Sequence, residues 1–192
     1  AVVDSNVRGR LLSSYGYTIT DSNTGKAFFT ATGRQKLASD LTTALKNPEI
    51  FQFLIDELTT MYSGRGITKV IGIESRGFIF GALLAEKLGV GFVPVRKPGK
   101  LPAEKISESY SLEYGQDSIE IHSDSIEPGD KVLIHDDLLA TGGTMEAACK
   151  LIEKLKGEIV QVSFIVELTF LNGREKLNKY DVSSLISYAD EN

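Results

Sequence analysis

Hydrophobic positions follow two spacings along the chain, and their alternation predicts strands and helices in turn. Continuous apolar runs at 68–74, 131–135 and 158–168 are typical of buried parallel strands. Apolar residues that return every three or four positions at 50–61 and 145–155 predict amphipathic helices. Strands that alternate with helices predict an α/β fold, with a central, mainly parallel sheet flanked by helices on both faces.

Further segments extend this pattern. Asn47-Pro48-Glu49 predicts a helix start, because Asn caps a helix, Pro suits its first position and Glu favours its first turn. We also predict a helix over 78–89, and strands at 92–97, 118–122 and 181–187, of which 118–122 alternates like an exposed strand. Residues 98–118 lose apolar periodicity, which predicts a long, flexible loop of the functional kind.

The first 35 residues are polar and glycine-bearing, and their periodicity is weak. They are typical of an irregular or small β-rich segment. A chain of 192 residues suits one domain with a small appendage. We therefore predict an N-terminal hood over residues 1–36 and a core domain over residues 37–192.

Composition and charge narrow the classes of partner. The net charge of -5 argues against binding nucleic acid by general electrostatic attraction. No apolar run approaches the roughly 20 residues of a membrane span, so we expect no membrane partner. Cys149 is the single cysteine and lies among apolar helix positions, which favours a core residue in a reducing, cytoplasmic setting.

The stretch VLIHDDLLATGGT, residues 132–144, is where the chemistry concentrates. Its small-residue loop, Ala140–Thr144, joins a strand to a helix, so backbone N–H groups and the helix N-terminus face any bound anion. Thr141 and Thr144 add hydroxyl donors. This is a phosphate cradle, but not a Walker A loop, because no Lys follows the glycines.

Asp136 and Asp137 precede this loop and have the wrong charge for a phosphate. Two carboxylates suit a sugar diol, which needs two acceptors, or Mg²⁺ held on the same ligand. A cradle beside paired acids therefore suits a ribose 5-phosphate. In the simpler alternative, one Asp caps the loop and the other is solvated.

These residues resemble the phosphoribosyl-pyrophosphate motif of type I phosphoribosyltransferases. The agreement narrows to the adenine phosphoribosyltransferases of that family, and from about Asn47 to Leu177 it is carried in order by IESRGFIFG, RKPGKLP, SYSLEYG, DDLLATGGT and VELTFLNGREKL. The resemblance implies a purine salvage enzyme that transfers the 5-phosphoribosyl group from 5-phosphoribosyl 1-pyrophosphate to adenine. Mg²⁺ and a homodimer are implied as well.

The resemblance also implies a role for each matching residue. Glu113 would assist proton movement at the purine, Tyr114 would help its loop close, and Leu138 would lie against the base. The donor would be held by Arg76, Arg96, Lys97, Lys100, Asp136, Asp137, Ala140, Thr141, Gly142, Gly143 and Thr144. The two acids would meet Mg²⁺ mostly through ligand and water. Dimers of the family commonly lend Arg96 or Lys97 across their interface.

The hood departs from the family pattern. Where the family has an aromatic residue over the purine, this chain has Ala38, although Asp40 matches. Phe28 or Phe29 would be the replacement. The departure leaves open a preference for hypoxanthine, guanine or xanthine.

Other classes of protein remain as alternatives. A regulator that senses the donor without transferring it would need a DNA-binding module, and the first 35 residues are not basic. A structural oligomerisation domain would leave the paired acids unexplained.

Individual residues have simpler interpretations too. Arg76 would pair with Glu74, Lys97 and Lys100 would be solvated, and Glu113 would be an ordinary exposed acid. For His122 and His135 we favour the structural reading over a metal site, because neither has a partner at ligand spacing.

Overall fold

The computed structural model describes residues 17–19, 27–29, 41, 45–111 and 115–189. The chain divides into two compact units, of which the first ends at Phe51. In that first unit, β1 (Tyr17–Ile19) pairs antiparallel with β2 (Ala27–Phe29). The predicted boundary between residues 36 and 37 lies outside the described residues and stays a prediction.

Helix α4 (Pro48–Tyr62) begins as the sequence predicts. The side-chain Oδ1 of Asn47 accepts hydrogen bonds from the N–H groups of Glu49 and Ile50, at 3.0 and 3.1 Å. Two of the N–H groups that a helix start leaves without partners are thereby satisfied.

A five-stranded parallel sheet forms the centre of the second unit. Its strand order is β4-β3-β7-β8-β9, and every neighbouring pair is parallel. The strands are β3 (Lys69–Ile73), β4 (Gly91–Val95), β7 (Lys131–Leu139), β8 (Glu158–Leu168) and β9 (Val182–Tyr188). The predicted strands are confirmed, and all five carboxyl ends lie at one edge, where the loops of such sheets bind ligands.

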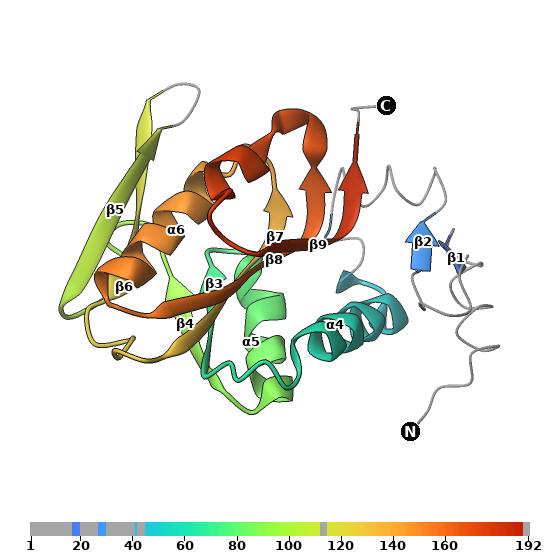
Figure 1. Ribbon diagram of the computed structural model, residues 1–192, viewed down its shortest axis with the longest axis horizontal. Coiled ribbons are helices and arrows are strands. Elements are labelled where there is room, and N and C mark those ends of the chain that lie inside the picture. The colour runs from blue at the N-terminus through green and yellow to red at the C-terminus, as the bar shows by residue number, and fades with distance from the viewer. Residues whose placement is uncertain (1–16, 20–26, 30–40, 42–44, 112–114, 190–192) are drawn as a thin grey trace. The chain divides into compact units, whose positions relative to one another are not determined.

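Helices cover both faces of this sheet, as predicted. Helix α5 (Gly77–Leu88) packs on β3, β4 and β7 through buried Phe80 and Leu84. Helix α6 (Gly143–Lys154) lies against β7 and β8 on the opposite face (Figure 1). None of the described helices has the length and apolar character needed to cross a membrane.

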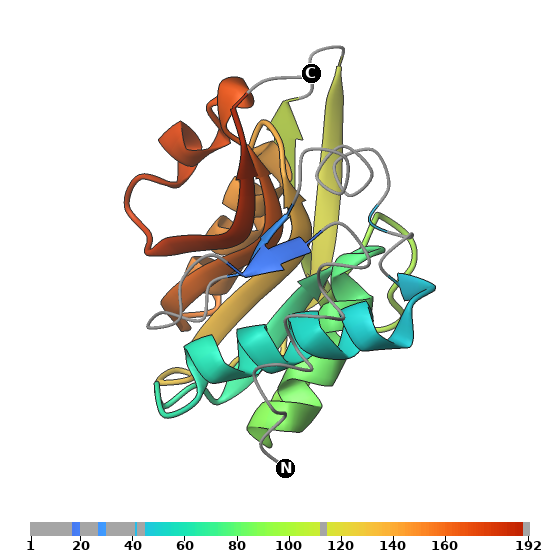
Figure 2. The same ribbon diagram turned by 90° about the vertical axis from the view of Figure 1, so that its right-hand side faces the viewer.

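A hairpin replaces much of the loop expected over residues 98–118. β5 (Lys105–Ser111) pairs antiparallel with β6 (Gln116–His122), and Figure 2 shows the pair as a long two-stranded arm. The hairpin packs on α6, which buries Ile119 and Ile121, so 118–122 is not the exposed strand that its alternation predicted. Strand β5 was not predicted from the sequence, because most of its side chains are polar and only one of its faces packs on α6.

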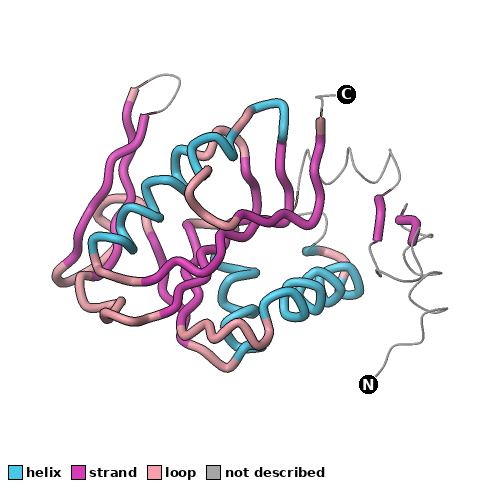
Figure 3. Tube along the Cα trace, viewed as in Figure 1, coloured by secondary structure: helices cyan, strands magenta, loops and turns pink. Residues whose placement is uncertain are grey.

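The core between the sheet, α6 and the hairpin is continuous and apolar. Cys149 is fully buried in it, as predicted, and burial raises the pKa of its thiol to about 12. Strand β8 continues at its carboxyl end into two short 3-10 turns, η1 (Thr169–Leu171) and η2 (Gly173–Leu177), which Figure 3 colours as helix.

Candidate functional site

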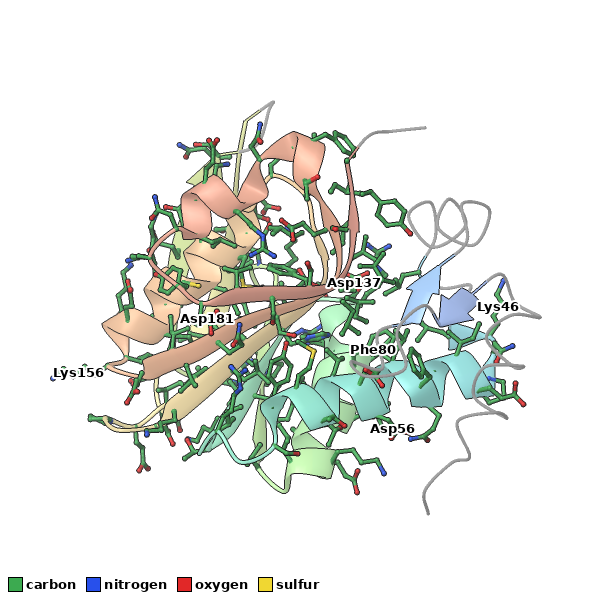
Figure 4. The ribbon with its side chains drawn as sticks, turned by 45° about the vertical axis from the view of Figure 1, so that its right-hand side comes forward. Lys46, Asp56, Phe80, Asp137, Lys156 and Asp181 are labelled. Atoms are coloured by element: carbon green, nitrogen blue, oxygen red, sulfur yellow. The ribbon has the colours of Figure 1, made fainter. Side chains whose placement is uncertain are left out.

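Both acids of the central motif lie inside strand β7, not after it. Asp136 is opposite Phe164 of β8, and the pairing continues as far as Leu139 opposite Glu167. The strand therefore ends two residues beyond Asp137, at the ligand-binding edge of the sheet (Figure 4). Continued pairing with β8 holds the backbone extended and places both carboxylates rigidly.

Asp136 lies where α5 begins. Its Oδ1 accepts a hydrogen bond from the N–H of Asp137 at 2.9 Å. A Cβ at Gly77 would lie 2.9 Å from the same oxygen, so only glycine lets the helix start so close. Burial, and then the charge of Asp137, raise the pKa of Asp136 well above its ordinary value.

Asp137 is paired with Arg76. The Arg76 Nε lies 2.5 Å from Asp137 Oδ2, and the aspartate side chain is only 6% exposed. The approach is close but poorly aligned, and among the described residues no hydrogen bond reaches that buried oxygen. Arg76 neutralises the charge of this buried oxygen, but a well-aligned donor such as a ligand hydroxyl would improve its hydrogen bonding.

A second cluster surrounds Glu74, at the end of β3. Arg96 donates to both carboxylate oxygens of Glu74 at 3.2 Å, and the Lys97 N–H donates at 2.9 Å. That N–H, and after it Arg96, hold the pKa of Glu74 below its ordinary value in spite of partial burial. Arg76 therefore does not pair with Glu74. Glu74 pairs with Arg96, and Arg76 pairs with Asp137.

Lys97 is not a solvated loop cation. Its ammonium hydrogen-bonds to the Tyr110 hydroxyl at 2.8 Å and to the Asp117 carboxylate, both on the hairpin. Burial alone would lower the pKa of Lys97, but these two bonds outweigh it and raise the pKa. Lys100 is exposed, and its carbonyl accepts from Arg96 at 3.3 Å.

The small-residue loop has the shape that a phosphate cradle needs. Gly142 has φ 77°, in the left-handed region, and α6 starts at the next residue. The Gly142 carbonyl accepts from the Glu146 N–H at 2.9 Å, so the N–H groups before Glu146 have no acceptor within the helix. Thr141 is exposed, while Ala140 and Thr144 are half-buried.

A third segment supports this loop from behind. A Cβ at Gly142 would collide with the Gly173 carbonyl, and a Cβ at Gly173 would collide with the carbonyl of Ala140. The two backbones therefore touch, and both positions require glycine. This contact makes the start of η2 the back wall of the cradle.

Some predicted site residues are not placed by the structure. Glu113, Tyr114 and Ala38 lie outside the described residues, so their roles stay predictions. Leu138 is half-buried at the end of β7. His135 is fully buried, with Nδ1 3.1 Å from the Ser163 hydroxyl, and burial lowers its pKa to about 3.

Three contacts at the site were not predicted from the sequence. Glu74 binds Arg96, Asp117 binds Lys97, and Gly173 supports the loop. Glu74 and Gly173 lie in the stretches IESRGFIFG and VELTFLNGREKL, which carried the resemblance, but nothing local marked them. The sequence did not indicate a role for Asp117, because its bond to Lys97 forms only once the hairpin is folded.

The geometry joins three chemical capacities at one edge of the sheet. The loop offers free N–H groups to an anion, the paired acids offer acceptors to hydroxyls, and the Glu74 cluster gathers cations nearby. Such a site suits a sugar that carries both a phosphate and a second anionic group. The fold and this site are those of a phosphoribosyltransferase.

Comparison with known proteins supports this assignment to the phosphoribosyltransferases. The phosphoribosyl transferase domain model matches residues 42–190, and the chain belongs to that family. Within the family, the chain is 57% identical over 152 residues to the adenine phosphoribosyltransferase of Flavobacterium johnsoniae, which covers 79% of this chain and 89% of that protein.

Solved structures agree as well. The adenine phosphoribosyltransferase of Thermoanaerobacter pseudethanolicus superposes with a TM-score of 0.75 at 45% identity, covering 93% of this chain and 99% of that one. The Saccharomyces cerevisiae enzyme, crystallised with an imino-altritol bisphosphate and adenine, gives a TM-score of 0.73 at 39% identity and covers 94% and 99%. The chain is thus placed among the adenine phosphoribosyltransferases.

Proposed function

We propose that the protein transfers the 5-phosphoribosyl group from 5-phosphoribosyl 1-pyrophosphate to adenine, in purine salvage. N9 of adenine forms a bond to C1 of the ribose while the bond from C1 to the pyrophosphate oxygen breaks. The purine loses a proton, and the products are AMP and pyrophosphate. The relatives named above carry this activity in their names, and the geometry of the site supports it.

The observation that carries the proposal is the buried Asp137 Oδ2, which accepts no hydrogen bond among the described residues, beside loop N–H groups that have no acceptor within α6. Ribose hydroxyls would donate to Asp136 and Asp137, and the 5-phosphate would accept from Ala140–Thr144. One rigid strand, β7, leads directly from the acids to the loop. A single ribose 5-phosphate therefore satisfies both sets of groups.

The pyrophosphate would face the basic residues. Arg76, Arg96, Lys97 and Lys100 stabilise the charge that grows on the leaving oxygens. Lys97 contacts these oxygens only after its bond to Asp117 breaks. Binding of the leaving group therefore depends on the position of the hairpin that carries Asp117.

Mg²⁺ fits this site in an indirect form. Among the described residues no group of three His, Cys, Asp or Glu could cage a metal. Asp136 and Asp137 would therefore hold the ion mainly through water and the pyrophosphate, as Mg²⁺ commonly binds. When bound, Mg²⁺ neutralises charge on the departing pyrophosphate.

The remaining roles rest on the resemblance. Glu113 would assist the proton transfer at the purine, and Tyr114 would close the hairpin loop over it. Leu138 would contact the base, and Ala38 would face it from the hood. A closed loop excludes water, which otherwise hydrolyses the donor.

We also infer a homodimer in the cytoplasm. Helix α5 exposes Ile79 (38%) and Leu83 (36%), the large exposed apolar residues of the described chain, beside the edge strand β4. A second copy would cover them. The unpaired, buried Cys149 is consistent with a reducing compartment.

The test combines binding and turnover. Isothermal titration of the donor with Mg²⁺ should show binding at one site per chain, and adenine should then yield AMP and pyrophosphate. Hypoxanthine, guanine and xanthine, assayed in parallel, should turn over at least about a hundredfold less well. Donor binding without turnover of any base would end the proposal and favour a donor sensor.

A further inference from the structure

The phosphate cradle has no cation within its own loop, yet one lies beside it in space. The ammonium of Lys176, in η2, is 3.8 Å from the position that a Cβ at Gly143 would occupy. Gly143 and Lys176 line the same cavity of about 250 Å³, between the start of α6 and the hairpin. The cavity is therefore bounded by the first residue of α6 on one side and by an ammonium on another.

The segment that carries Lys176 is held firmly. Arg174 donates to both carboxylate oxygens of Glu167, at 2.6 and 2.7 Å, and Leu177 is fully buried in the core. Gly173 touches the backbone of Ala140, as described above. Lys176 thus projects from a rigid turn, and its approach to Gly143 follows from that anchoring.

Lys176 is also the lysine of this cavity that has no carboxylate partner among the described residues. Lys150, on α6, is paired with Glu146 at 2.7 Å. Lys154, one turn further along, is paired with Glu108 at 2.6 Å. The Glu146 carboxylate at the cavity is thereby neutralised, and the positive charge of Lys176 is available to an anion.

We propose that Lys176 is a further phosphate-binding residue, whose ammonium pairs with the 5-phosphate of the donor and of the AMP product. The inference rests on the proposed function and adds a residue to that site. A phosphomonoester dianion bound at the loop has oxygens beyond those that the N–H groups reach. An ammonium from a separate segment satisfies one of them with a charge-assisted hydrogen bond.

The test compares ligands with and without a phosphate. AMP and ribose 5-phosphate are titrated into the wild type and into the Lys176→Gln, Lys176→Arg and Lys156→Gln variants. Lys156, labelled in Figure 4, is an exposed lysine beyond the opposite end of α6 and does not line the cavity, so its substitution removes the same charge outside it. Adenine carries no phosphate, so its KM, measured at saturating donor, is the control for effects outside phosphate binding.

Lys176→Gln should raise the Kd for both phosphates about five- to tenfold, and less at high salt. The KM for adenine should not change, Lys176→Arg should restore most of the affinity, and Lys156→Gln should bind like the wild type. Wild-type affinity in Lys176→Gln, or equal losses in Lys156→Gln, would overturn this inference alone. A wild type that binds neither phosphate would overturn the proposed function with it.

Discussion

Two carboxylates near the carboxyl ends of neighbouring strands each pair with an arginine from another segment. Asp137 of β7 pairs with Arg76, which precedes α5, and Glu167 of β8 pairs with Arg174 of η2. They match in burial: the acid side chains are 6% and 4% exposed, and the arginines 44% and 47%. They differ in hydrogen bonding. This difference sets the group that we propose to bind a ligand apart from one that holds the fold.

Glu167 is fully satisfied. Arg174 donates to both of its oxygens, and the Ser184 hydroxyl adds a bond at 2.7 Å. Burial alone would raise the pKa of Glu167, but these bonds outweigh it and lower the pKa. The pair needs nothing more, and its effect is to fasten η2 to β9.

Asp137 is the incomplete pair. Its Oδ2 lacks a hydrogen bond among the described residues, and its neighbour Asp136 has a raised pKa. Such a pair would cost stability in the free protein, and a ligand that supplies donors would complete it. The contrast shows that burial and charge alone do not distinguish the two pairs, whereas their hydrogen bonding does.

Asp137→Asn should give the largest effect, because it removes the charge that we propose to meet the ribose hydroxyls. We expect kcat/KM for the donor to fall about 30- to 100-fold, the loss of a charge-assisted hydrogen bond. Titration of the donor with Mg²⁺ should show the same loss in Kd. Asp181→Asn, at a side chain 71% exposed, is the matched control and should leave both quantities unchanged.

Equal donor affinity in Asp137→Asn and the wild type would show that the incomplete pair is not the diol site. Glu113→Gln should behave differently, with turnover lowered and donor binding retained. The two variants together separate the residue that holds the sugar from the one expected to move a proton.

Gly173→Ala tests whether the two pairs are linked. Gly173 follows β8, which carries Glu167, and its backbone contacts Ala140 in the loop that follows β7. A Cβ there collides with the Ala140 carbonyl, so the loop or η2 must shift. We expect about 2 kcal/mol of lost stability in urea unfolding, typical of overpacking, and a donor Kd several-fold higher. Gly91→Ala, whose Cβ meets only Lys69 Cγ at 3.7 Å, is the control.

An unchanged donor affinity in Gly173→Ala, with stability lowered, would confine Gly173 to a packing role. The back wall of the cradle would then not control the loop's geometry, and the two pairs would act independently.

The comparison also shows how far sequence reasoning reaches. The β7 acids and their loop were predictable, because residues local in sequence build them: a strand, two acids and small residues in one run. The five parallel strands followed from apolar runs of the kind seen in 158–168, which β8 matches. Apolar periodicity reports burial, and a parallel sheet is buried on both faces.

The long-range contacts were not predictable. Pairing of Arg76 with Glu74, two residues away, is the simpler interpretation that the sequence offers, but the folded chain pairs Arg76 with Asp137 and Glu74 with Arg96. Strand β5 falls in the segment predicted to be a loop, because it has polar side chains at most positions and is covered on one face only. Partners of charged residues depend on the tertiary fold, and a local pattern does not carry that information.

Glu167→Gln should break the complete pair and test its structural role. Gln fills the same space but loses the charge that Arg174 and Ser184 recognise, so we expect about 1–2 kcal/mol of lost stability. Urea unfolding followed by circular dichroism measures it. Asp137→Asn, by contrast, should be nearly neutral in stability, and an equal loss in both variants would remove the distinction between the two pairs.

The smallest effect is the pH dependence of that loss. The folded pKa of Glu167 is lowered, so its contribution to the free energy of unfolding is complete above the unfolded pKa of about 4.3. It is lost as the pH falls through the folded value, where the carboxylate takes up a proton and the ion pair with Arg174 ends. The difference in unfolding free energy between wild type and Glu167→Gln should therefore be constant from pH 7 to about 5, and shrink below that. A difference that persists or grows in acid would mean that the carboxylate's shape, and not its charge, fastens η2 to the sheet.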